Sequence, residues 1–130
     1  IVDGCISNLF CRTPYAYDKA FEWSRHKTEY QKRAGFSMMA YLAVHDKKAP
    51  DEKMLQFLPV MIREATDERN FVRKAVNWAL RSAGKRNKNL CDAAMKVADE
   101  LRKSENKTER WIGSDAYREL NEKIEEGYFD

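Results

Sequence analysis

Apolar residues recur at intervals of three and four along most of this chain, and no stretch shows the strict alternation that is typical of a β-strand. The pattern predicts the end of one helix over residues 1–10, followed by helices that begin near Tyr15, Thr28, Pro50, Asp67, Asn89 and Asn106. Pro59 lies inside the helix that begins at Pro50, so we expect a kink there. The sequence therefore predicts an all-α fold.

Each predicted helix carries an apolar stripe that we expect to be buried. The stripe of the helix from 50 consists of Leu55, Leu58, Met61, Ile62 and Ala65, and that of the helix from 67 consists of Val72, Ala75, Val76, Ala79 and Ala83. We also expect Tyr30 and Trp111 to be core residues. Asp67 is placed to cap its helix and Gly84 to end it.

The chain contains an internal period of about 40 residues. Residues 30–34 and 71–75 share the order aromatic, any residue, two cations, alanine, and they start 41 residues apart; Trp111 follows Phe71 by 40. Two-helix units of this length are typical of HEAT-like repeats, which stack into a curved α-α superhelix and bind partners on the concave side. The alternative is a helical bundle with coincidental spacing. We interpret residues 1–130 as one such domain, and as the C-terminal part of a longer protein, because the chain opens inside an apolar helix.

Composition and charge narrow the class of protein. Hydrophobic residues make up 43% and charged residues 35%, which is typical of a globular domain, and no apolar run is long enough to cross a membrane. Three cysteines without a CxxC pair favour reduced thiols in a cytoplasmic protein over a disulfide or metal site. The formal net charge is +3, but residues 119–130 contribute −4, so the other 118 residues carry +7. A basic body with an acidic tail fits phosphate binding through one surface.

Cations concentrate in residues 70–87, beside a tryptophan, Trp78, that lies off the apolar stripe. This combination favours a helix that meets a polyanion. The candidates for contact with a DNA backbone are Arg33, Lys32, Arg73, Lys74, Arg81, Lys85, Arg86 and Lys88. Ordinary solvated surface charge is the alternative for each of them. No glycine-rich phosphate loop or nucleophile motif is present, so we expect no organic cofactor and no metal.

The segments VDGCISNLF, EYQKRAGF and FVRKAVNWALR resemble the HEAT-like-repeat DNA alkylation repair enzymes, from Ile1 to about Leu120. The resemblance implies an alkylpurine DNA glycosylase whose active site is an aspartate flanked by two tryptophans, with an arginine nearby. Asp3, Trp78 and Arg33 match the aspartate, the second tryptophan and the arginine. The first tryptophan would lie four residues before Asp3, ahead of Ile1.

The physical roles can be stated for each of the three residues. A carboxylate at Asp3 would stabilise positive charge on the sugar and orient water; otherwise Asp3 is a solvated terminal residue. Trp78 would offer a π face to a cationic base, or else it packs between repeats. Arg33 would hold a phosphate, or else it pairs with Glu29 one turn away.

The expected function is DNA alkylation repair: hydrolytic release of cationic N3- or N7-alkylated purines from double-stranded DNA by a monomeric enzyme. The alternative is a non-catalytic HEAT-repeat module that binds structured nucleic acid or a protein.

Overall fold

The computed structural model describes residues 16–25, 27–46 and 49–129, and within them the chain is helical with no strand. Asp3, Cys5 and Cys11 lie outside these residues. The helices are α2 Ala16–Ser24, α3 Glu29–His45, α4 Asp51–Leu55, α5 Phe57–Glu64, α6 Asn70–Gly84, α7 Lys88–Arg102 and α8 Lys107–Glu125. The all-α prediction is confirmed, and none of these helices is long and apolar enough to cross a membrane.

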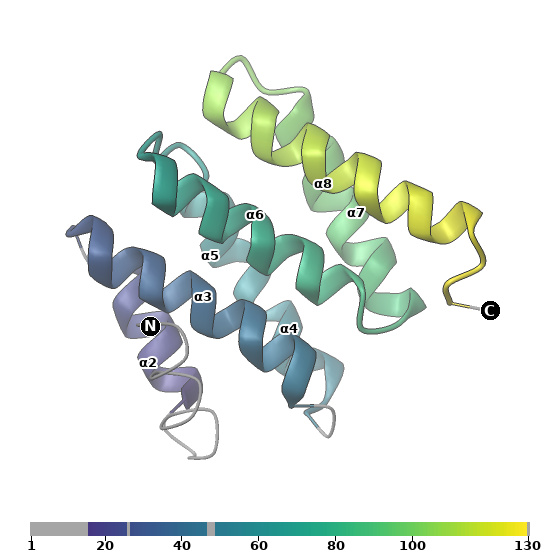
Figure 1. Ribbon diagram of the computed structural model, residues 1–130, viewed down its shortest axis with the longest axis horizontal. Coiled ribbons are helices and arrows are strands. Elements are labelled where there is room, and N and C mark those ends of the chain that lie inside the picture. Colours follow the sequence, from purple (N-terminus) through teal and green to yellow (C-terminus); the bar gives the residue numbers. More distant parts are fainter. Residues whose placement is uncertain (1–15, 26, 47–48, 130) are drawn as a thin grey trace.

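The helices form two layers (Figure 1). Helices α3, α6 and α8 lie side by side in the front layer and run in the same direction, while α2, the α4–α5 pair and α7 lie behind them. Helix α3 packs on α2 and α6, and α8 packs on α6 and α7. The chain thus alternates between back and front layers, as stacked two-helix units do. The curvature expected of a HEAT-like superhelix stays a prediction.

Burial follows the apolar stripes for most helices. All five predicted stripe residues of α6 are buried, as are Leu90, Ala94, Val97, Ala98 and Leu101 of α7. Two expectations for α4 and α5 were wrong, since Leu55 and Ile62 are exposed. Both side chains line a groove between the α4–α5 pair and α7 instead. Tyr30 and Trp111 are also exposed rather than buried.

The break between α4 and α5 falls at Gln56, three residues before Pro59. Proline removes the hydrogen bond that its own N–H would donate to the carbonyl four residues earlier, and its ring crowds that carbonyl. For Pro59 that carbonyl belongs to Leu55, the last residue of α4. The irregularity is therefore a one-residue break at Gln56, one turn before Pro59, and the backbone of Gln56 itself stays helical, with φ −65° and ψ −23°.

Arg86 joins the end of α3 to the start of α4. Its Nη1 donates to the carbonyl oxygens of Ala43 at 2.8 Å and Asp46 at 2.9 Å, and its Nη2 donates to that of Ala49 at 3.0 Å. Two of these carbonyls lie at the C-terminal end of α3, where helix groups lack partners and the helix dipole is negative. Arg86 therefore stabilises the chain reversal between the two layers.

An ion cluster ties α3 to the segment between α5 and α6. The ammonium of Lys32 lies 2.5 Å from Glu64 Oε1 and 2.9 Å from Asp67 Oδ2, and Lys32 is buried. Asp67 also accepts from the Arg69 side chain and backbone N–H. Asp67 was predicted to cap α6, but the residue at the cap position is Arg69 and no side chain caps there. The two cations hold its carboxylate instead.

These contacts lower the pKa of both carboxyl groups. For Asp67, the hydrogen bond from the Arg69 side chain is the main cause; burial opposes it, and Lys32 adds to it. For Glu64, burial acting alone would raise the pKa, but hydrogen bonds from Lys32 and Arg63 outweigh it. Folding therefore favours the ionised form of each group.

We expect this cluster to make the protein acid-sensitive. Because the folded-state pKa values lie below the ordinary values of 4.5 and 3.8, the stabilisation is complete above those values and is lost as pH falls toward the folded ones. Replacing Lys32 with Met removes one cation, so the free energy of unfolding should fall by on the order of 2 kcal/mol at neutral pH.

Urea unfolding measured across a pH series checks this. K32M should show a shallower loss of stability below pH ~4.5 than the wild type, because its carboxyl pKa values are less depressed. K96M, at an exposed lysine of α7, is the matched control and should follow the wild-type curve. An identical acid slope in K32M and wild type would show that the cluster does not cause the effect.

Candidate nucleic-acid interface

Trp78 stands at the centre of the front layer. It lies on α6, outside the buried stripe that includes Val76 and Ala79. Its side chain is half-buried and packs against the hydrophobic core. Helix α6 lies between α3 and α8 (Figure 1), and Trp78 lines two clefts beside it. The indole is therefore packed on one side and open to clefts on the other.

One cleft, of about 410 Å³, lies between α3, α6 and α8. Its walls carry Trp78 together with three cations, Arg33, Lys74 and Arg81. The structure thus brings Arg33 and Trp78, from separate helices, to the same cleft. Asp115 of α8 also lines it and binds Arg118 through a 2.7 Å hydrogen bond.

A second cleft, of about 820 Å³, begins on the other side of the indole. Trp78 and Arg81 line both clefts, and Lys85 and Arg86 line the second. The two spaces therefore meet at the indole, and cations outnumber the aspartates that line them, which are Asp115 in the first and Asp51 in the second. Such a surface attracts phosphate and offers one π face.

Two of these cations share a carboxylate. Arg81 Nη1 donates to Glu119 Oε2 at 2.8 Å, and Lys85 Nζ donates to Glu119 Oε1 at 2.7 Å. Burial acting alone would raise the pKa of Glu119, but the hydrogen bonds from Lys85 and Arg81 lower it overall. The ionised carboxylate of α8 therefore occupies the position between two cations that a phosphate would take.

Two guanidinium groups of the front layer stack on aromatic rings of the next helix. Arg33 of α3 lies 5.1 Å from the centre of the Phe71 ring on α6, and Arg73 of α6 lies 4.7 Å from that of Trp111 on α8. Arg73 also donates to Asn70 Oδ1 at 3.2 Å. Each ring holds the neighbouring guanidinium in place through a cation–π contact.

The other candidate cations differ in what they already contact. Lys32 is engaged by Glu64 and Asp67, and Arg86 by three carbonyl oxygens, so we leave both out of the proposed interface except as supports. Lys88 is exposed and lies 3.5 Å from Asp92 on α7, behind the front layer. Lys74 is exposed beside the first cleft.

Several residues of this surface were missed or misread in the sequence. Phe71 and Trp111 border the first cleft, and Glu119 partners its cations, although it seemed to belong to a separate acidic tail. The 40-residue period was the available signal, because it places Tyr30, Phe71 and Trp111 at equivalent positions. Among the described residues, no three metal-ligating side chains gather at one place.

We expect Glu119 to weaken nucleic-acid binding by competing for Arg81 and Lys85. Neutralising it in E119Q should tighten binding to duplex DNA. The affinity should also fall more steeply with salt concentration, by a slope that corresponds to about one to two additional released counterions. Anisotropy titrations across a salt series measure both quantities. D99N is the control, because Asp99 also pairs with two cations, Arg102 and Lys103, but on α7 away from the clefts. Equal changes in the two variants would mean that only net charge matters.

Comparison with known proteins agrees with the resemblance seen in the sequence. A family model described as DNA alkylation repair enzyme matches residues 1–120, a span that includes Asp3, Arg33 and Trp78. Searches of curated proteins and of solved structures found no significant match. The family match covers most of the 130 residues. The chain therefore belongs to the DNA alkylation repair enzyme family.

Proposed function

We propose that the protein is a DNA glycosylase that releases cationic N3- or N7-alkylated purines by hydrolysis. The observation that carries this proposal is the half-buried indole of Trp78, which lines a cationic cleft together with Arg33. Membership of the DNA alkylation repair enzyme family supports DNA as the substrate, and alkylated DNA is part of the proposal. Phosphate contacts from Arg33, Lys74, Arg81 and Lys85 would hold the backbone while the indole meets the damaged nucleotide.

Alkylation at N3 or N7 gives the purine a positive charge, which makes it a good leaving group. In the proposed reaction, the bond from C1′ of the sugar to N9 breaks and its electron pair neutralises the departing base. The oxygen of a water molecule then bonds to C1′, and its proton passes to a carboxylate or to solvent. Positive charge builds on the sugar on the way, so an anion beside it lowers the barrier.

We assign that anion to Asp3 on the strength of the family motif. Asp3 lies outside the described residues, so its distance to Trp78 and Arg33 is part of the proposal. Trp78 would contribute selectivity, because a desolvated cation–π contact stabilises a charged base by up to ~2 kcal/mol relative to a neutral one. Such preference for a charged base is what a glycosylase of this type requires.

Transfer of the alkyl group to a protein thiol is less well supported. Such transfer needs an accessible thiolate as nucleophile. Cys91 is fully buried, and that burial raises the pKa of its thiol, which keeps it protonated. Of the cysteines, it is the one that the described part of the chain contains.

The Asp3 assignment predicts loss of excision without loss of binding. Asp3→Asn should lower the rate of 7-methylguanine excision by about 100-fold or more, since it removes the charge that stabilises the transition state. The measurement treats an alkylated duplex with protein and then cleaves abasic sites in hot alkali. Undiminished excision by D3N would remove Asp3 from the mechanism. Binding of alkylated duplex without strand breaks by the wild type would favour a non-catalytic module.

The role of Trp78 predicts a graded series. Trp78→Leu keeps an apolar side chain but removes the π face, so excision of a cationic lesion should fall by about 10- to 30-fold. Trp78→Phe keeps a weaker π face and should lie between Leu and the wild type. Thermal unfolding of each variant controls for packing. If Phe and Leu variants excise equally well, the π face has no part in the reaction.

A further inference from the structure

Three exposed aromatic rings form a row across one end of the front layer. Tyr30 is 61% exposed, Phe71 53% and Trp111 37%. They lie near the starts of α3, α6 and α8, whose N-terminal ends are side by side in Figure 1. We call Tyr30, Phe71 and Trp111 the aromatic row. None of the three belongs to the described hydrophobic core.

Guanidinium groups alternate with these rings. Arg33 projects from α3 onto Phe71, and Arg73 projects from α6 onto Trp111. The order across the layer is therefore tyrosine, arginine, phenylalanine, arginine, tryptophan. Since it arises from the 40-residue period, each helix of the front layer presents one ring on the same edge.

A partner for this row must offer flat π faces and negative charge together. An apolar protein surface would have to bury Arg33 and Arg73 against it, which costs free energy. A DNA duplex presents phosphates but keeps its base faces stacked inside. An unpaired strand presents both, because its bases stack on aromatic rings or guanidinium planes while its phosphates meet cations. Lys74, exposed between Phe71 and Trp78 on α6, adds a further cation.

We propose that the aromatic row binds single-stranded DNA, or the unpaired stretch of a partly opened duplex. The row is continuous with the first cleft, because Phe71 and Trp111 line that cleft with Trp78. A strand stacked on the row would lead toward the indole. This proposal rests on the proposed function only in assigning the front layer to DNA, and it requires no excision.

Anisotropy titration with a labelled oligothymidine and with a duplex of equal length tests it. Phe71→Ala and Trp111→Ala should each weaken oligothymidine binding by about fivefold or more. Duplex affinity should fall by clearly less than oligothymidine affinity, because a duplex loses only the positioning of Arg33 or Arg73 and offers no free base face. Trp111→Phe keeps a ring that can stack and should retain most of the oligothymidine affinity.

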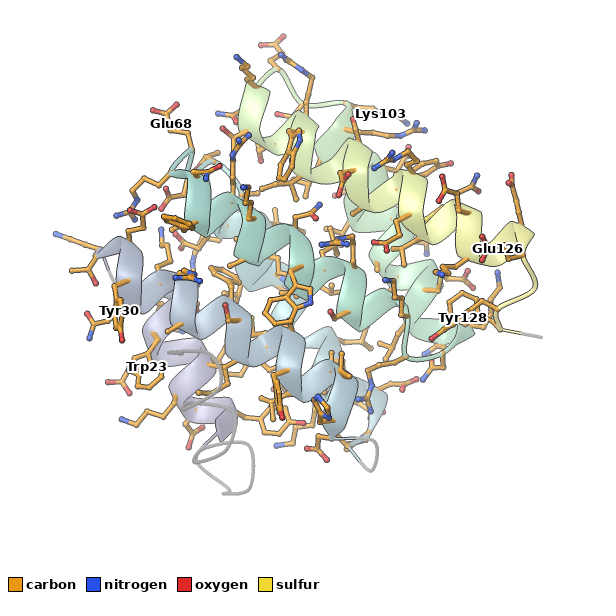
Figure 2. All side chains as sticks on the ribbon, in the orientation of Figure 1. Trp23, Tyr30, Glu68, Lys103, Glu126 and Tyr128 are labelled. Carbon is orange, nitrogen blue, oxygen red and sulfur yellow. The ribbon has the colours of Figure 1, made fainter. Side chains whose placement is uncertain are left out.

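Two control variants show whether a loss of DNA affinity comes from lost base stacking, from lost charge or from removal of any surface ring. Lys74→Ala should weaken both DNA forms alike, since it removes only a phosphate contact. Tyr128 is 53% exposed at the opposite end of the molecule from Tyr30 (Figure 2), but it lines the second cleft and is therefore no neutral control. The matched ring control is Tyr117→Ala, because Tyr117 also carries a guanidinium, that of Arg102 at 3.9 Å from the ring centre, and lines neither cleft. Tyr117→Ala should change neither affinity appreciably.

The outcomes distinguish this proposal from the glycosylase assignment. Equal losses on both DNA forms in Phe71→Ala and Trp111→Ala, or no loss on oligothymidine, would overturn the aromatic row as a single-strand site. Selective loss on oligothymidine would support it even if no alkylated base is released. Excision that persists without any oligothymidine binding would be consistent with the glycosylase proposal and would contradict the single-strand site at the aromatic row.

Discussion

The burial of one face of α6 against α3, α7 and α8 is the constraint on which this structure depends. Small residues dominate that face, with Ala75, Val76, Ala79 and Ala83 all buried, so neighbouring helices approach α6 closely. Asn77 adds a polar link, since its Nδ2 donates to the carbonyl oxygen of Ile112 at 3.1 Å. With that face committed, the residues of α6 that stay partly or fully exposed are Asn70, Phe71, Arg73, Lys74, Trp78 and Arg81.

The cations of the front surface, which we propose as a DNA interface, are partly neutralised by contacts within the protein. Glu119 satisfies Arg81 and Lys85, and Phe71 and Trp111 hold Arg33 and Arg73 by stacking. These contacts keep flexible cations in defined positions, which reduces the entropy lost when a phosphate arrives. The same contacts should also lower the affinity of this surface for polyanions in general. Selectivity for a damaged nucleotide would then depend on what the indole and the aromatic row can contact.

Helix positions and most buried stripes could be predicted because they follow from local periodicity. The errors arose where distant residues decide the outcome. Asp67 looked like a helix cap, but its carboxylate is taken by Arg69, two residues on, and by Lys32, which lies 35 residues away in sequence. Trp111 and Tyr30 were expected in the core, whereas the structure exposes both, and the Arg73 guanidinium lies over the Trp111 ring. Glu119 was assigned to an acidic tail because its partners, Lys85 and Arg81, lie 34 and 38 residues earlier in the chain. The residues next to Glu119 give no sign of these contacts.

The most direct test of the account is to identify the product from methylated duplex DNA. Chromatography of the low-molecular-weight fraction after incubation with excess protein separates free 7-methylguanine from intact nucleotides. The account predicts free 7-methylguanine with wild-type protein and far less with Trp78→Leu. A methyl group removed while the guanine stays in the strand, or no free base at any protein concentration, would contradict it.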